Sequence, residues 1–295
     1  MVLDPVKGTA FLYLTGLGTM GNVLVFVSYM HMFQSTVKKP IHLVLAHLAL
    51  TNIIMLLSKG MLKTIEAFNF RNFLDDTSCK VVVYLARVSR GLSICTSSLL
   101  TVVQAVTISP RASRWQRLNL KSPQHILSLL LLFWILNSLI SMNLLYYIKN
   151  IKSVNITQSK RGSNYCYFLP ESRITRWIFL TLMVLRDAVF QGAMGGASGY
   201  MVLLLHKHHQ HVLYLQNSKL LYRTPPELRA SQSVLLLMLC FLFFYLTDCS
   251  ICLYFTFFIE KILYVPEFLT LGYAVISPFI LIHRDEHLTK CCHTP

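Results

Sequence analysis

Charged side chains are scarce in this 295-residue chain. Only 13% of its residues are charged, and 12 acidic residues stand against 27 basic ones. A soluble domain carries about 25% charged residues, whereas this chain is 54% hydrophobic with a mean hydropathy of +0.54. The few charges are clumped between long apolar runs, which excludes an ordinary cytosolic enzyme, a disordered chain and a DNA-binding domain. The net charge of +15 therefore indicates basic loops beside a membrane rather than a nucleic-acid surface.

Catalytic motifs are also missing. The chain has no glycine-rich phosphate-binding loop, no spaced set of zinc ligands and no paired-carboxylate motif, so we expect no enzyme activity, cofactor or metal site. Gly196-Ala197-Ser198-Gly199 matches the GxSG string of rhomboid intramembrane proteases. The last two predicted spans hold no His, and His206 lies about 12 Å further along the same helix, too far to act as the base. The glycines instead predict close packing of membrane helices; they are Gly192, Gly195, Gly196 and Gly199.

Residues 206–211 contain four histidines and one lysine. Such a cluster can chelate a metal, but no set of carboxylates or thiols accompanies it. We therefore interpret it as a basic, partly protonatable surface at the start of a cytoplasmic loop.

Long apolar runs dominate the rest of the chain. A membrane-crossing helix needs about 20 mostly apolar residues, and seven such spans fit, approximately over residues 8–30, 41–66, 80–109, 125–148, 174–205, 229–258 and 264–282. Pro278 lies inside the seventh span and predicts a kink there. We predict an all-α seven-transmembrane helix bundle, a single domain over 1–295 with a short cytoplasmic tail at 283–295. The alternative is a six-span protein whose weak last segment lies in the interface.

Three features place the N-terminus outside and the C-terminus inside. The predicted inner loops carry twelve Lys and Arg residues and the outer loops carry eight, a modest bias in the direction of the positive-inside rule. The one N-glycosylation sequon, at Asn155, lies in the loop between spans four and five. Cys166 lies in that loop and Cys79 opens span three, so a disulfide between them requires the oxidising side of the membrane.

An odd number of spans, an outer N-terminus and this cysteine pair describe a G-protein-coupled receptor. Four strings then resemble segments of the vomeronasal type 1 receptors: HLVLAHLALTNIIMLLSKG (42–60), LSICTSSLLTVVQAVTISPR (92–111), LLHKHHQHVLYLQNSKLLYRTPPELRASQSVLLLM (204–238) and SPFILIHRDEHL (277–288). The resemblance implies a pheromone receptor in the plasma membrane of vomeronasal sensory neurons. It also implies a small-molecule ligand and a heterotrimeric G protein of the Gi/o type as partners.

The chain departs from rhodopsin-like receptors at their polar switches. Asn52 stands where span two of those receptors usually has a sodium-binding Asp, and Thr107-Ile108-Ser109 stands where they carry Asp-Arg-Tyr. Ser277 and Pro278 begin a string that replaces their Asn-Pro-x-x-Tyr. The switch mechanism of that larger class is therefore not transferable residue by residue.

Charges within the spans define the candidate ligand site. Such charges are costly and normally face the bundle interior, and here they lie in the outer halves or at mid-depth: Lys59, Lys63, Arg87, Arg90, Arg186, Asp187 and Asp248. Five cations against two anions predict an outward-facing basic cavity that prefers small organic anions, with Tyr254 and Tyr273 as part of its wall. The alternative is internal pairing, in which Arg186 or Arg87 neutralises Asp187 or Asp248.

Further residues are assigned by their position beside the membrane. Five basic residues of the inner loops are predicted G-protein contacts, with a purely topological role as the alternative: Arg111, Arg114, Arg117, Lys219 and Arg223. Cys291 and Cys292 follow the last span and are a candidate palmitoylation site. Two other functions remain open, a bitter-taste type 2-like receptor and a small membrane transporter, although neither an internal repeat nor paired interrupted helices are visible.

Overall fold

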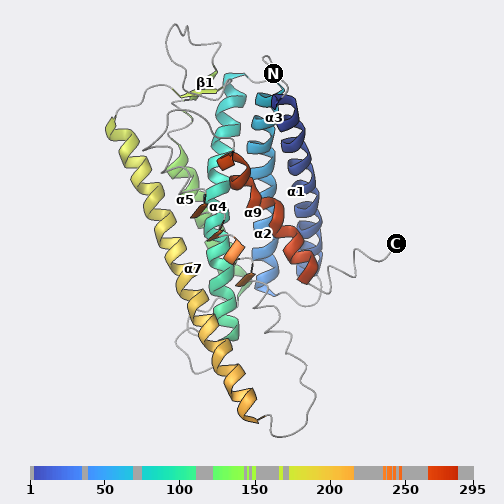
Figure 1. Cartoon of the computed structure of the whole chain (residues 1–295). Coiled ribbons are helices and arrows are strands. Elements are labelled where there is room, and N and C mark those ends of the chain that lie inside the picture. Colours follow the sequence, from blue (N-terminus) through green and yellow to red (C-terminus); the bar gives the residue numbers. More distant parts are fainter. Residues whose placement is uncertain are drawn as a thin grey trace.

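Long helices lying side by side make up the described part of the protein. The computed structural model describes residues 3–34, 39–68, 75–110, 122–142, 145, 148–150, 166–168, 173–215 and 265–284, with short helical stretches at 235–236, 238–240, 242–243 and 246–247. The helices are α1 (Leu3–Gln34), α2 (Pro40–Met55), the π-helix η1 (Leu56–Gly60), α3 (Met61–Ala67), α4 (Asp76–Ile108), α5 (Pro123–Ser141), α7 (Arg173–Leu215) and α9 (Val265–Arg284). Figure 1 shows them as one elongated bundle.

Five of these helical segments are long and apolar enough to cross a membrane. They are Gly8–Gln34, Pro40–Ile65, Thr77–Ile108, Pro123–Ser141 and Trp177–Lys207, and Leu271–His283 is a shorter apolar helix. Together with the family match reported below, these helices confirm the predicted all-α transmembrane fold. Most of the sixth predicted span, 229–258, lies outside the described residues.

The fourth and fifth predicted spans differ from the observed helices in the residue at which they end. The span predicted over about 125–148 contains α5, which ends at Ser141, and a helical residue at Leu145, while Ile148 belongs to strand β1 (Ile148–Asn150). The span predicted to end at 205 continues as α7 to Leu215. No Gly or Pro occurs between 206 and 215 to break the helix, so the histidine-rich stretch is helical rather than a loop.

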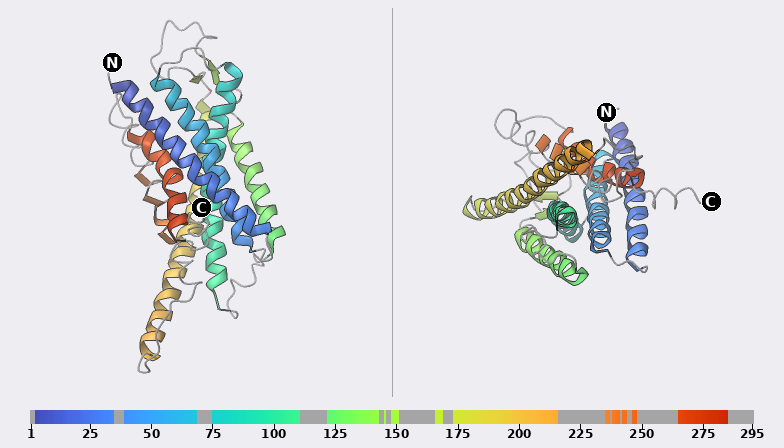
Figure 2. Two further views of the ribbon diagram at one scale, coloured as in Figure 1. Left: turned by 90° about the vertical axis from the view of Figure 1, so that its right-hand side faces the viewer. Right: turned by 90° about the horizontal axis from the view of Figure 1, so that it is seen from below.

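The helix α4 occupies the middle of the bundle. It contacts α2, α5 and α7, and the view from below shows it between them (Figure 2). Every residue from 91 to 106 except Val102 is buried, and the main apolar core gathers Leu92, Leu100, Ile126 and Met194 from three helices. Helices at the periphery keep apolar side chains exposed on their outer faces, as lipid-facing helices do.

A small antiparallel sheet covers the end of the bundle where α1 and α4 begin (Figure 1). Strand β1 (Ile148–Asn150) pairs with β2 (Cys166–Phe168) in the register Ile148↔Phe168, Lys149↔Tyr167 and Asn150↔Cys166. Because β1 also contacts α4, the sheet holds the segment that begins at Cys166 close to the first turns of α4.

Candidate functional site

Two predicted ligand-binding residues, Arg186 and Asp187, bind each other. The guanidinium Nη2 of Arg186 lies 2.6 Å from Oδ1 of Asp187, and its Nε donates to the same oxygen at 2.8 Å. Only 3% of the Arg186 side chain and 14% of the Asp187 side chain are exposed. A buried charge that is paired and hydrogen-bonded avoids most of its desolvation penalty, so the internal pairing considered from the sequence is what the structure shows for this pair.

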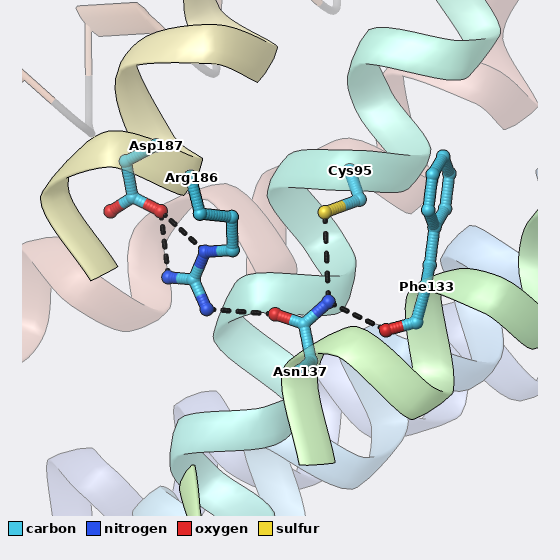
Figure 3. A network of polar contacts seen from close by, with 5 residues as sticks. All are labelled: Cys95, Phe133, Asn137, Arg186 and Asp187. Atoms are coloured by element: carbon cyan, nitrogen blue, oxygen red, sulfur yellow. Dashed lines mark hydrogen bonds and ion pairs between the residues drawn. The ribbon is translucent and has the colours of Figure 1, made fainter. Parts of the chain in front are cut away.

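The amide of Asn137 extends the pair to a second and a third helix (Figure 3). Its Oδ1 accepts a hydrogen bond from Nη1 of Arg186 at 2.7 Å. Its Nδ2 donates to the carbonyl oxygen of Phe133 at 2.8 Å and contacts the Cys95 sulfur on α4 at 3.6 Å. This polar cluster, which we call the Asn137 network, joins α7, α5 and α4 in the middle of an apolar core.

Gly91 on α4 makes room for the Asn137 network. A Cβ atom at this position would overlap Oδ1 of Asn137 and Nη1 of Arg186. Glycine is therefore required by close approach of two side chains, because its own backbone is ordinary helix. Sequence reasoning missed both Asn137 and Gly91, although a buried amide inside the apolar fourth span was a visible signal.

The four other cations of the predicted ligand site lie on three consecutive helical elements. Lys59 lies on η1, Lys63 on α3, and Arg87 and Arg90 on α4. All four are half-buried, and each has an interaction partner within the protein. A π-helical turn inside a longer helix is frequently found at functional sites, and here η1 carries Lys59.

Tyr273 on α9 is deeply buried and belongs to the main core. It is 4% exposed, and its hydroxyl lies 3.3 Å from Oγ of Ser97 on α4. The other predicted site residues lie outside the described residues: Arg111, Arg114, Arg117, Asn155, Lys219, Arg223, Asp248, Tyr254, Cys291 and Cys292.

A layer of amides replaces the polar switch of rhodopsin-like receptors. Nδ2 of Asn52 donates to Oδ1 of Asn22 at 3.2 Å and to Oγ of Ser277 at 3.0 Å. Asn22 in turn donates to the carbonyl oxygen of Ala274 at 2.8 Å. These bonds tie α1, α2 and α9 together without a formal charge.

Two more polar contacts cross the bundle. His47 on α2 accepts a hydrogen bond from Nε1 of Trp134 at 2.9 Å on its Nε2, which leaves Nδ1 to donate to Oγ1 of Thr96 at 3.0 Å. Near the end of α4, the hydroxyls of Ser109 and Tyr200 are hydrogen-bonded at 2.8 Å. The second contact ties the C-terminal end of α4 to α7.

Cys79 is disulfide-bonded and fully buried in the first turn of α4. The side chain of Cys166, its predicted partner, is outside the described side chains, while its backbone opens β2.

The glycines of α7 do not pack as predicted. Within the described residues, a Cβ atom added at any of the four would meet no other atom within 4 Å: Gly192, Gly195, Gly196 and Gly199. All four are exposed, so this stripe lies on the open side of α7, where no described residue packs closely against it.

The chain is similar to known proteins over nearly its whole length. Residues 6–294 match the family described as the vomeronasal organ pheromone receptor family. Vomeronasal type-1 receptor 3 of Homo sapiens is 33% identical over 287 residues, which cover 93% of this chain and 91% of that protein. Olfactory receptor class A-like protein 1 of Danio rerio is 30% identical over 292 residues, 96% of this chain and 90% of that protein. Vomeronasal type-1 receptor 46 of Mus musculus is 32% identical over 278 residues, which cover 92% of this chain and 89% of that protein.

Proposed function

The chain belongs to the vomeronasal organ pheromone receptor family, and from this we propose how it works as a chemosensory G-protein-coupled receptor. A pheromone-like small molecule binds between the outer halves of the helices, and the receptor activates a Gi/o-type G protein. The observation that carries the proposal is the match of residues 6–294 to this receptor family, together with helices long and apolar enough to cross a membrane.

The charge balance favours an anionic ligand. Arg186 and Asp187 cancel each other, so the remaining charges of the predicted site are four cations, Lys59, Lys63, Arg87 and Arg90, and one anion, Asp248. Four cations against one anion leave these predicted site residues with a formal excess of positive charge. Carboxylate, sulfate and phosphate groups form the strongest hydrogen bonds with such cations.

Ligand binding would activate the receptor by shifting its helix arrangement. A ligand shifts such an equilibrium only by its difference in affinity for the two states. The hydrogen bond between Ser109 and Tyr200 joins the inner ends of α4 and α7. Predicted G-protein contacts follow these two helices in the chain, at Arg111, Arg114 and Arg117 after α4 and at Lys219 and Arg223 after α7.

The proposed orientation puts the N-terminus and the small sheet outside the cell. Cys79 is disulfide-bonded, and a bond to Cys166 is supported by the contact of β1 with α4 and by the pairing of Asn150 with Cys166. With that orientation Asn155 is accessible for glycosylation, and Cys291 and Cys292 lie on the inner side, where palmitoylation occurs. We place the receptor in the plasma membrane of vomeronasal sensory neurons.

A ligand screen tests the function. Cells expressing the chain with a promiscuous G protein are exposed to sulfated small molecules and their unsulfated analogues, and activation by at least one sulfated compound is expected. Replacing the promiscuous subunit by a Gi/o subunit must preserve the response. Solute flux without any dependence on a G protein would instead favour a transporter.

Charge reversal tests the anion preference. Arg90→Glu is expected to weaken a sulfated agonist far more than its uncharged analogue, because only the former depends on positive charge at the site. Lys80→Glu is the matched control, since Lys80 lies on the same helix about 15 Å nearer its start. Equal losses for both agonists in Arg90→Glu would refute an anion-selective site.

A further inference from the structure

Gln191 carries a buried amide in the middle of a membrane span. It lies on α7 near the centre of the segment Trp177–Lys207. Within the described part of the chain, both Oε1 and Nε2 are buried and neither has a hydrogen-bond partner. The other buried amides that cross the bundle, Asn22, Asn52 and Asn137, all donate hydrogen bonds through Nδ2, although Oδ1 of Asn52 has no partner among the described residues. An unpaired buried amide costs free energy, so a group that pairs with it on binding would recover that cost.

Gln191 lies on a different face of α7 from the residues that contact α5. Arg186 and Phe190 face α5, through the bond to Asn137 and through a T-shaped contact of Phe190 with Phe133 at 5.2 Å. Gln191 is turned about 100° from Phe190 around the helix axis. It follows Asp187 by four residues, so the two side chains share one helix face. Gly195 follows Gln191 by four residues and is exposed, so Gln191 lies at the edge of the open side of α7 while its two amide atoms are buried.

A second unpaired group lies on the neighbouring helix. Ser93 on α4 is 3% exposed, and its hydroxyl likewise has no hydrogen-bond partner among the described residues. It precedes Ser97 by four residues, and Ser97 contacts Tyr273 of α9, so Ser93 stands on the side of α4 that faces the bundle interior. Since α4 packs directly against α7, two helices in contact each carry a buried neutral polar group that no described residue pairs.

The chemistry of these groups differs from that of the outer cations. A primary carboxamide has two N–H donors and one acceptor oxygen, and a hydroxyl adds a donor and an acceptor. The nearby charge of Arg186 is already matched by Asp187. We propose that Gln191 is a specificity-determining residue that binds a neutral ligand group with a donor and an acceptor side by side, such as a carboxamide or lactam. The inference rests on the proposed function and defines the chemistry of the deeper part of its ligand site.

The first test needs no ligand. Gln191→Met removes the unpaired amide at nearly constant volume, so the melting temperature of the purified ligand-free receptor is expected to rise by about 2–4 °C. The matched control is Asn137→Leu, which removes a fully paired amide and is expected to lower the melting temperature. A fall in melting temperature for Gln191→Met would show that Gln191 supports the fold, which would overturn the proposal.

The second test uses octanamide and methyl octanoate as probes. Octanamide offers a donor and an acceptor together, and the ester offers no donor. Octanamide is expected to stabilise the wild-type receptor against heat more than the ester does, and Gln191→Met is expected to weaken its apparent affinity about tenfold. Comparing one probe between two proteins removes differences in partitioning into detergent.

Each outcome of the probe experiment is decisive. Absence of any octanamide-dependent stabilisation of the wild-type receptor up to the solubility limit overturns the proposed ligand class. Equal stabilisation of wild type and Gln191→Met overturns the role of Gln191. Ser93→Ala is expected to weaken octanamide to a smaller extent. Stabilisation without G-protein activation in cells would leave this inference standing while the proposed function fails, because heat stability is measured without a G protein.

Discussion

The Gly91→Ala variant gives a sharp test of how the buried polar cluster is built. In the interior of a helix, alanine is normally favoured over glycine by up to about 1 kcal/mol. At position 91 the added methyl group overlaps Oδ1 of Asn137 and Nη1 of Arg186. The substitution is therefore expected to destabilise the protein, against the sign that helix propensity alone predicts.

The magnitude follows from the contacts that must give way. Loss of a hydrogen bond to a charged group costs about 1.5–3 kcal/mol, and forcing an extra methyl group into a packed core costs about 1–3 kcal/mol. Subtracting the gain in propensity leaves a net destabilisation of about 1.5–5 kcal/mol, and each kcal/mol lowers the melting temperature by roughly 2–4 °C.

The assay is thermal unfolding of the purified receptor in detergent, followed with a thiol-reactive dye. Cys95 is free and fully buried beside Asn137, so its sulfur becomes reactive when the core opens. Gly195→Ala on α7 is the matched control, because a Cβ atom there meets nothing within 4 Å among the described residues. That variant is expected to be neutral or slightly stabilising.

A Gly91→Ala protein as stable as the Gly195→Ala protein would refute the reasoning. A double-mutant cycle adds a second criterion. In an Asn137→Ala background, the cost of Gly91→Ala is expected to shrink, because one of the two overlapping groups is gone. Strict additivity of the two changes would show that Gly91 and Asn137 do not compete for the same space.

Three further variants test other contacts. Asp187→Asn leaves the buried Arg186 without its counter-charge, so the stability measured by thermal unfolding is expected to fall by about 3 kcal/mol, and an unchanged melting temperature would contradict this. Trp134→Phe removes the donor to His47 and is expected to cost about 1–2 kcal/mol; a Phe variant as stable as wild type would show that the indole contributes only its ring. Cys79→Ser is expected to lower stability by about 2–4 kcal/mol and to abolish any further effect of a reducing agent, whereas a persistent effect would assign the reducible bond to other cysteines.

Local sequence properties were sufficient for the transmembrane fold class and the family. An apolar run long enough to cross the bilayer is visible without any knowledge of neighbours, and the strings at 42–60 and 92–111 carry the family resemblance on their own. Helix ends were less predictable, because an apolar run does not say where hydrogen bonding stops. Thus the run predicted to 148 is helical to Ser141, and the histidine-rich stretch at 206–211 extends α7 instead of opening a loop.

Side-chain roles required the tertiary structure. The sequence showed that Arg186 and Asp187 are costly inside a membrane, and left pairing and ligand binding as alternatives. Deciding between them depends on how α4, α5 and α7 are rotated about their axes, because Asn137 meets Arg186 across 49 residues of chain. Gln191 could not be singled out from the sequence for the same reason. The sequence shows that a glutamine is present but not whether its amide has a hydrogen-bond partner on another helix.

The sequence by itself therefore determined which segments lie in the membrane and which class of receptor the chain belongs to. Both follow from hydropathy and motif strings, which are properties of contiguous residues. What only the tertiary structure decided is which polar groups satisfy one another. Gly91 owes its place to two side chains from other helices, and Gln191 has no partner among the described residues while three other buried amides are bonded. In a low-dielectric interior this pairing fixes which groups hold the helices together and which remain for a ligand.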